Sequence, residues 1–224
     1  MRSYNILINK HQGRRAFVVG AGTSLFELDL SPIINDVVIS VNSSILKFDW
    51  QDGISDNRYW VSNDSAVRYW SYWKDVKSSM ATKLIRDSWE KYFNEIPEFL
   101  VFSPRKLESN LQDEEKLCFT SSVPTAIDLA IQMGCNEIFL LGVDHYFVGR
   151  LSHFWQYWPK EKQPKPLRTI LATYSMQNNI FKLNQHVYSA LNEYAKSKHI
   201  NIYNCSLHSR ISVFEKVKYE DIVK

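Results

Sequence analysis

Short apolar runs alternate with amphipathic stretches along this chain. The runs are rich in β-branched and aromatic residues, as in VVISV and EIFLL. They predict strands at residues 16–20, 37–42, 59–62, 82–85, 99–103, 137–142 and 200–204. Helical spacing of apolar residues predicts helices at 122–133 and about 173–198. Continuous apolar strands that alternate with helices indicate a mainly parallel sheet with helices on both faces, so we expect an α/β, Rossmann-like fold in one domain over residues 1–224.

The segment at residues 147–167 breaks this alternation. It has poor periodicity and carries GR, PK and QPKP, which are typical of loops. Long segments of this kind inside a compact domain are often functional loops. We therefore expect residues 147–167 to form a mobile lid over a binding site.

The composition narrows the class of protein. With 224 residues and 45% hydrophobic content, the chain can bury a sizeable core. Its 27 basic and 24 acidic residues are evenly spread and leave a net charge of only +3, which disfavours nucleic acid as a partner. The three cysteines are isolated, so they form neither a disulfide framework nor a metal ribbon and suit a reducing compartment.

The chain shows no targeting or membrane signal. Its first residues, MRSYNILINKHQGRR, lack the apolar run of a signal peptide. No stretch reaches the roughly 18 uninterrupted apolar residues that a transmembrane helix needs. We expect a cytoplasmic protein without a transmembrane segment, and a homo-oligomer is compatible with the sequence.

The first predicted strand ends in a glycine turn, within RRAFVVGAGTSL. Gly20 and Gly22 flank Ala21, and Thr23 and Ser24 follow where a helix could start. Glycines allow backbone N–H groups to approach a phosphate closely, and a helix N-terminus favours an anion. The third glycine of the dinucleotide fingerprint is absent, because Leu25 occupies its place. The turn is therefore either a phosphate site or a tight bend after a buried strand.

Polar residues also follow the other predicted strands. In open parallel sheets, ligands bind at the carboxyl ends of the strands. Serine, asparagine and aspartate are common turn and cap residues, but their joint occurrence at one rim favours a site for phosphate and ribose. The second strand ends in an asparagine rather than in the carboxylate that would bind the ribose of NAD, which disfavours a dinucleotide oxidoreductase. The rim residues are Gly20, Gly22, Ser24, Asn42, Ser43, Ser44, Asn63, Asp64, Asp144 and His145.

Three hydroxyl residues, Thr120, Ser121 and Ser122, precede the helix predicted at 122–133. Pro124 in its first turn is typical of a helix start. Such a start can hold an anion, whereas the alternative is that the three hydroxyls only cap the helix or are solvated.

The order of these motifs resembles a known family. GAGTSL, a strand ending in asparagine, TSS at a helix start and EIFLLGVDHY are similar to the bacterial sialyltransferases of glycosyltransferase family 42. They equally resemble the broader family typed by the archaeal MptE-like 6-hydroxymethylpterin diphosphokinases, as does the ending INIYNCSLHSRISVFEKVKYEDI. The resemblance covers about residues 16–147 and 185–222.

The sialyltransferase resemblance implies a nucleotide-sugar site at the strand ends. Tyr146 would support the leaving phosphate, and His153 stands where the family has a second tyrosine in its mobile loop. Ala21 replaces the asparagine that the family usually has between the glycines. Taken with the rim, the residues expected to bind nucleotide or substrate are Gly20, Ala21, Gly22, Ser24, Asn42, Ser43, Asn63, Thr120, Ser121, Ser122 and Asp144.

Transfer of a sugar needs a base for the proton of the acceptor hydroxyl, and histidine suits this role near neutral pH. His186 on the long helix is the first candidate and His145 at the rim the second. The resembled family carries its base about one turn before His186, where this chain has Lys182. His153 would stabilise the departing phosphate. We expect the remaining histidines on exposed termini or turns, namely His11, His199 and His208.

These residues lead to one prediction and two alternatives. We predict a metal-independent glycosyltransferase that takes a nucleotide-activated sugar, with a CMP-sugar favoured, and a glycan or small-molecule acceptor, in bacterial surface glycan synthesis. No cofactor and no metal site are expected, although Asp144, His145 and His153 are possible metal ligands. An ATP-dependent diphosphokinase would instead need magnesium, held by Asp64 and Asp144. The second alternative is a nucleotide-binding protein without catalysis.

Overall fold

The apolar runs pair into a parallel sheet. The computed structural model describes residues 2–48, 56–93, 96, 99–105, 116–118, 120–167 and 174–224. Every register between neighbouring described strands is parallel. In spatial order the strands are β1 (Arg2–Ser3), β6 (Phe99–Arg105), β5 (Thr82–Arg86), β4 (Arg58–Ser62), β3 (Val37–Val41), β2 (Arg15–Val19), β8 (Glu137–Leu141), β9 (Asn201–Asn204) and β10 (Glu215–Lys216), with β7 (Lys116–Cys118) paired to β6.

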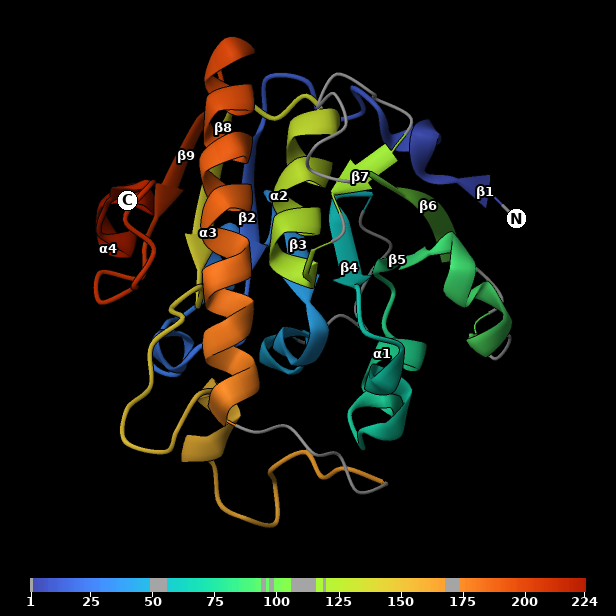
Figure 1. The fold of residues 1–224 in the computed structure, drawn as a ribbon, viewed down its shortest axis with the longest axis vertical. Coiled ribbons are helices and arrows are strands. Elements are labelled where there is room, and N and C mark those ends of the chain that lie inside the picture. The colour runs from blue at the N-terminus through green and yellow to red at the C-terminus, as the bar shows by residue number, and fades with distance from the viewer. Residues whose placement is uncertain are drawn as a thin grey trace.

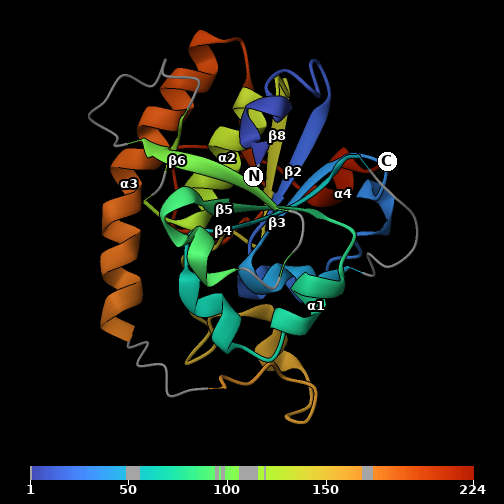
Figure 2. The same cartoon turned by 90° about the vertical axis from the view of Figure 1, so that its right-hand side faces the viewer.

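Helices lie on both faces of this sheet (Figures 1 and 2). The helices α2 (Ser122–Gln132) and α3 (Tyr174–Ser197) lie side by side on one face, and α1 (Trp73–Ser78) and α4 (Tyr219–Ile222) lie on the other. The α/β, Rossmann-like fold is confirmed. The helix predicted at about 173–198 is α3, and residue 173 lies outside the described residues.

The strands are apolar throughout because both of their faces are buried. In β2, Ala16 and Val18 belong to a core cluster beneath α2 and α3, whereas Phe17 and Val19 belong to a second cluster on the opposite face. Stacking of Phe17 on Phe139, with ring centroids 5.2 Å apart, continues the second cluster across the sheet. Burial on both faces replaces the apolar–polar alternation of a solvent-facing strand.

Several connections on the carboxyl side of the strands are short 3-10 helices. The residues after β2 form a 3-10 turn at Thr23–Leu25 rather than the start of an α-helix, and 3-10 helices also follow β3, β4 and β5. His11 was expected to be exposed, but it is buried, and its Nε2 atom makes a 2.7 Å hydrogen bond with the hydroxyl of Tyr59. This pair lies near the amino end of the sheet.

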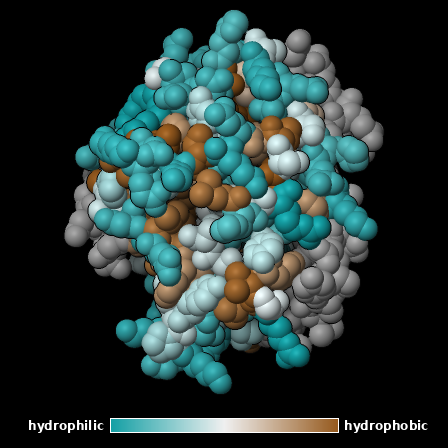
Figure 3. All heavy atoms as spheres, turned by 90° about the vertical axis from the view of Figure 1, so that its left-hand side faces the viewer, coloured by the Kyte–Doolittle hydropathy of each residue, from teal (hydrophilic) through white to brown (hydrophobic). Residues whose placement is uncertain are grey.

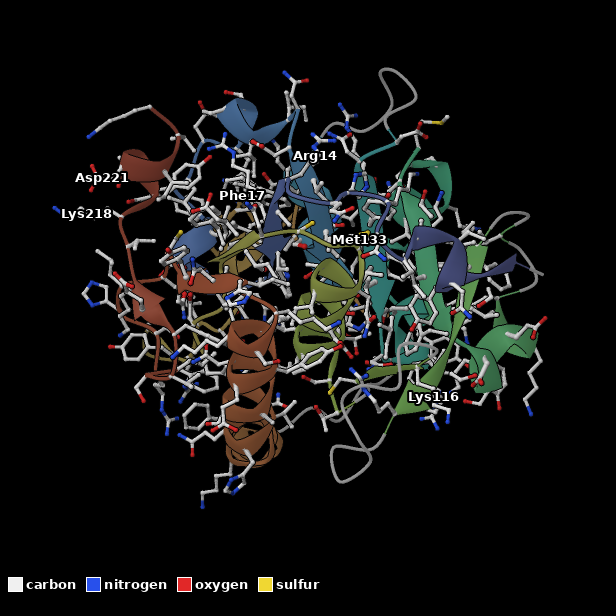
Figure 4. All side chains as sticks on the ribbon, turned by 90° about the horizontal axis from the view of Figure 1, so that it is seen from above. Arg14, Phe17, Lys116, Met133, Lys218 and Asp221 are labelled. Carbon is white, nitrogen blue, oxygen red and sulfur yellow. The ribbon has the colours of Figure 1, made fainter. Side chains whose placement is uncertain are left out.

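Figure 4 looks onto that amino end, with Arg14 immediately before β2 and Met133 immediately after α2. The carboxyl ends of the strands therefore lie on the opposite side, which is the lower end in Figure 1. The gold to orange segment at that lower end is the predicted lid, residues 147–167. The fold thus brings the polar strand ends and the lid to the same place.

Candidate active site

A cavity of about 420 Å³ opens at the carboxyl ends of β2, β3, β4 and β8, beside the first turn of α2. The strand order reverses at β2, which has β3 on one side and β8 on the other. In open α/β sheets, this reversal is where ligands bind. The cavity is lined by most of the residues that the sequence singled out: Ala21, Gly22, Asn42, Asn63, Thr120, Ser121, Ser122, Asp144, His145, Tyr146 and His153.

Five of the predicted residues do not line this cavity, and one of them, Ser44, is buried and donates a 2.6 Å hydrogen bond to the oxygen of Val19. Gly20 packs behind the turn, and Ser24 turns toward Asp144. Ser43 accepts a 3.1 Å hydrogen bond from Nε1 of Trp155 in the lid segment, so it fastens that segment rather than facing the cavity. His186 is exposed on α3.

The glycine turn is a close contact between two loops. A Cβ on Gly20 would lie 2.5 Å from the carbonyl oxygen of Gly142, and a Cβ on Gly22 would lie 2.5 Å from the Oδ2 atom of Asp144. The N–H of Gly22 donates a 2.8 Å hydrogen bond to the oxygen of Gly142. Both glycines are therefore required by the packing of the turn against the loop after β8, as the tight-bend interpretation expects.

Asp144 holds this turn in place. Its buried carboxylate accepts hydrogen bonds from the Thr23 hydroxyl, at 3.1 Å, and from the Ser24 N–H, at 2.8 Å. The Ser24 hydroxyl donates a third, at 2.5 Å. These hydrogen bonds involve both carboxylate oxygens. Asp144 therefore fixes the position of the turn after β2, which forms part of the cavity wall.

Asn63 leaves one acceptor without a partner. Its N–H donates to the Ser122 hydroxyl at 2.7 Å, and its side-chain amide donates to Thr125 at 2.6 Å. The Ser122 hydroxyl donates in turn to the Oδ1 atom of Asn42 at 3.3 Å. The Oδ1 atom of Asn63 is buried and has no hydrogen-bond partner among the described residues. A buried acceptor of this kind calls for a donor, such as a ligand hydroxyl or amino group.

The N-terminus of α2 also faces the cavity. Ser121 is the N-cap residue, but its side chain makes no capping hydrogen bond. Its hydroxyl instead accepts a 2.8 Å hydrogen bond from the side-chain amide of Asn184 on α3. Ser121, Ser122 and Val123 line the cavity, so the uncapped first turn of an eleven-residue helix points its positive end there. This end suits an anionic group such as a phosphate.

His145 is a neutral histidine at the rim. Its Nε2 atom makes a 2.9 Å hydrogen bond with the Tyr188 hydroxyl, and its ring lies 5.3 Å from that of Phe181, centroid to centroid. Burial lowers the pKa of His145 to about 4. Its backbone has a positive φ of 46°, in the left-handed region that residues other than glycine seldom adopt. The loop after β8 therefore holds His145 in a strained backbone conformation.

His153 reaches the same cavity from the lid segment. Its Nδ1 atom makes a 2.8 Å hydrogen bond with the Ser152 hydroxyl, and its ring stacks on Trp155 with centroids 5.2 Å apart. Burial lowers the pKa of His153 to about 4. Both cavity histidines are therefore neutral near pH 7 in the unliganded chain.

The lid segment packs onto the body of the protein. Phe154 is fully buried in the core, and its N–H donates a 3.1 Å hydrogen bond to the oxygen of Ala21. The N–H of Ser71 donates to the oxygen of Lys165 at 2.8 Å, which fastens the far end. This packing places His153 over the cavity, while the movement expected of the segment stays a prediction.

Sequence reasoning missed the contribution of α3. Phe181, Asn184 and Tyr188 share the helix face that meets the site, with Asn184 and Tyr188 bonded to Ser121 and His145. Their spacing of three and four residues was the available signal. His186 falls on the opposite face of this pattern and does not reach the cavity.

The described ranges contain neither a cluster of metal ligands nor a helix that could span a membrane. No group of three or more His, Cys, Asp or Glu side chains gathers there in a way that could hold a metal ion. Among the same residues, none of the helices combines the length and the apolar character needed to cross a bilayer.

Comparison with known proteins gives a shared fold. No protein-family model matches the chain, and no curated protein matches it in sequence. The MAf glycosyltransferase from Magnetospirillum magneticum AMB-1 is similar in structure, with a TM-score of 0.55 and 15% identity over 96% of this chain. This chain spans only 37% of the length of that protein. The similarity establishes a Rossmann-like fold found in a glycosyltransferase.

The sialyltransferase CstII from Campylobacter jejuni is a weaker match. Its complex with CMP-3FNeuAc aligns with a TM-score of 0.46 and 15% identity, over 91% of this chain and 86% of that one. Its complex with a trisaccharide acceptor and CMP aligns with a TM-score of 0.48. None of these structures supports the MptE-like part of the resemblance.

The lowered pKa values of the two cavity histidines, His145 and His153, predict a pH dependence of stability. An exposed histidine has a pKa near 6.5, so between pH 6.5 and about 4 the unfolded chain binds protons that the folded chain does not. Lowering the pH from 7 to 5 should therefore reduce the free energy of unfolding, by about 1–2 kcal/mol for each such histidine. Urea titrations of the wild type and of His153→Gln should show a smaller fall in the variant. His186→Gln, at an exposed position, is the control, and an equal fall in both variants would contradict this account.

Proposed function

We propose that this chain is a glycosyltransferase that takes a nucleotide-activated sugar, with a CMP-sugar as the favoured donor. The observation that carries the proposal is the uncapped N-terminus of α2, which faces a 420 Å³ cavity at the switch point of the sheet. This geometry suits the phosphate of the donor. The unpartnered Oδ1 atom of Asn63 suits a hydroxyl or amino group of the nucleoside.

The charge of the cavity favours a donor with one phosphate. No lysine or arginine is among the described residues that line it. The phosphodiester of a CMP-sugar carries one negative charge, which a helix N-terminus and hydroxyl donors can stabilise. UDP-sugars, GDP-sugars and ATP carry more charge, which proteins usually neutralise with basic side chains or a metal ion.

The same residues give less support to the diphosphokinase. That activity needs free carboxylates to hold magnesium among the phosphates. Asp144 is occupied by Thr23 and Ser24, and the Oδ1 atom of Asp64 accepts a 2.8 Å hydrogen bond from the N–H of Ala66 as a helix cap. The non-catalytic alternative is also less supported, because His145 and His153 both reach the cavity.

The proposed reaction is a direct displacement. The acceptor oxygen attacks the anomeric carbon of the sugar, the bond from that carbon to the phosphate oxygen breaks, and the acceptor proton passes to His145. In this proposal His145 replaces His186 as the base, because His186 lies on the exposed face of α3. A phosphate bound nearby would raise the pKa of His145 and so make it a stronger base. His153 and Tyr146 donate hydrogen bonds to the departing phosphate.

Calorimetry with CMP, UDP, GDP and ATP tests the donor class. We expect CMP to bind most tightly, with the same affinity in magnesium and in EDTA, because Asp144 already accepts three hydrogen bonds and Asp64 caps a helix. Asn63→Ala should weaken CMP binding by about tenfold, since a hydrogen bond is worth on the order of 1 kcal/mol. ATP binding that requires magnesium would overturn the proposal in favour of the diphosphokinase.

Release of CMP from CMP-activated sialic acid tests the base, with a simple galactoside as acceptor. Loss of a general base costs about 10²–10⁴ in rate, so His145→Asn should lower kcat by at least the smaller factor. Asparagine is chosen because it tolerates the positive φ at this position. His186→Gln is the matched control and should keep its activity within twofold. A large loss of kcat in His186→Gln together with a small loss in His145→Asn would instead assign the base to His186 on α3.

A further inference from the structure

A second cavity, of about 320 Å³, opens beside the first. The two cavities share Asp144 and Tyr146 in their walls. The rest of the second cavity comes from the turn after β2, from the lid segment and from His208, which follows β9. Figure 3 shows the face on the left of Figure 1, where brown apolar side chains interrupt the hydrophilic surface in several places.

Aromatic rings form one wall of the second cavity. Phe26 stacks on Tyr157 with centroids 4.8 Å apart and an angle of 27° between the rings. Tyr157 nevertheless remains 38% exposed, and Tyr146 and Val148 are 46% and 45% exposed. Large apolar side chains that stay exposed around a concavity are typical of a binding site. A flat ring backed by a second ring suits the C–H face of a sugar.

Glu27 provides the polar side of the same cavity. Its carboxylate is exposed and makes no hydrogen bond or ion pair with another described residue. A free carboxylate accepts hydrogen bonds from two hydroxyl groups and repels phosphate. No lysine or arginine is among the described residues of the wall. The chemistry therefore selects a neutral polyol rather than an anion.

We propose that the second cavity is the acceptor subsite and takes a neutral pyranose, the terminal sugar of a glycan. One face of the ring stacks on Tyr157, and hydroxyls on its edge donate to Glu27. Tyr146, which belongs to both walls, lies where the acceptor sugar meets the donor. This inference rests on the proposed function for its direction of transfer, whereas the pyranose site itself rests on Phe26, Glu27 and Tyr157.

Saturation-transfer NMR with methyl β-galactopyranoside and methyl β-glucopyranoside tests the site, with and without saturating CMP. We expect transfer to the ring protons of at least one glycoside, retained in the presence of CMP. Tyr157→Leu and Glu27→Gln should each weaken glycoside binding about three- to tenfold and leave CMP affinity unchanged. Tyr92→Leu is the matched control, because Tyr92 is 43% exposed and lies outside both cavities.

Three results would overturn the proposal of an acceptor subsite. They are the absence of transfer to either glycoside, displacement of the glycoside by CMP, and equal effects of Tyr157→Leu and Tyr92→Leu. The melting temperature of each variant reports whether it is folded. Glu27→Gln replaces an exposed side chain, so we expect its melting temperature to stay close to that of the wild type. Glycoside binding that depends on Tyr157 in a chain that does not bind CMP would support the pyranose site and contradict the nucleotide-sugar function.

Discussion

The site depends on the close approach of two loops, the glycine turn after β2 and the loop after β8. Gly20 and Gly22 bring the first loop against Gly142, at distances that leave no room for a Cβ. Asp144 then fastens the pair by accepting three hydrogen bonds from Thr23 and Ser24. Because the next residues along the second loop are His145 and Tyr146, this contact fixes where both side chains stand relative to α2.

The loop contact also divides the available space. Asp144 and Tyr146 stand between a cavity that is lined by amides, hydroxyls and a helix N-terminus and one that is lined by aromatic rings and a free carboxylate. The first suits an anion with polar substituents, and the second suits an uncharged ring. A transferase needs two such neighbouring sites, and the reacting groups would meet at Tyr146.

Much of the fold follows from the sequence because the strands are buried on both faces. Continuous apolar runs such as EIFLL have few alternatives, and the strand order placed Asn42, Asn63 and the residues after β8 at one edge. The glycine turn was harder to predict, since glycines suit both a phosphate and a close backbone contact, and the contact with Gly142 and Asp144 joins segments far apart in the sequence. The outward direction of His186 was equally hidden, because it depends on which face of α3 packs against α2. Phe154 shows a third limit, as an aromatic residue in a segment without periodicity turned out to belong to the core.

We expect the first turn of α2 to receive the phosphate of a nucleotide, in a cavity whose described lining residues include no lysine or arginine. A crystal structure of the chain bound to CMP tests this most directly. We expect the phosphate within hydrogen-bonding distance of the backbone N–H groups of Ser122 and Val123, with a group of the nucleoside donating to the Oδ1 atom of Asn63. A nucleotide found in the second cavity, or a phosphate held elsewhere while the α2 N-terminus contacts only water, would contradict it.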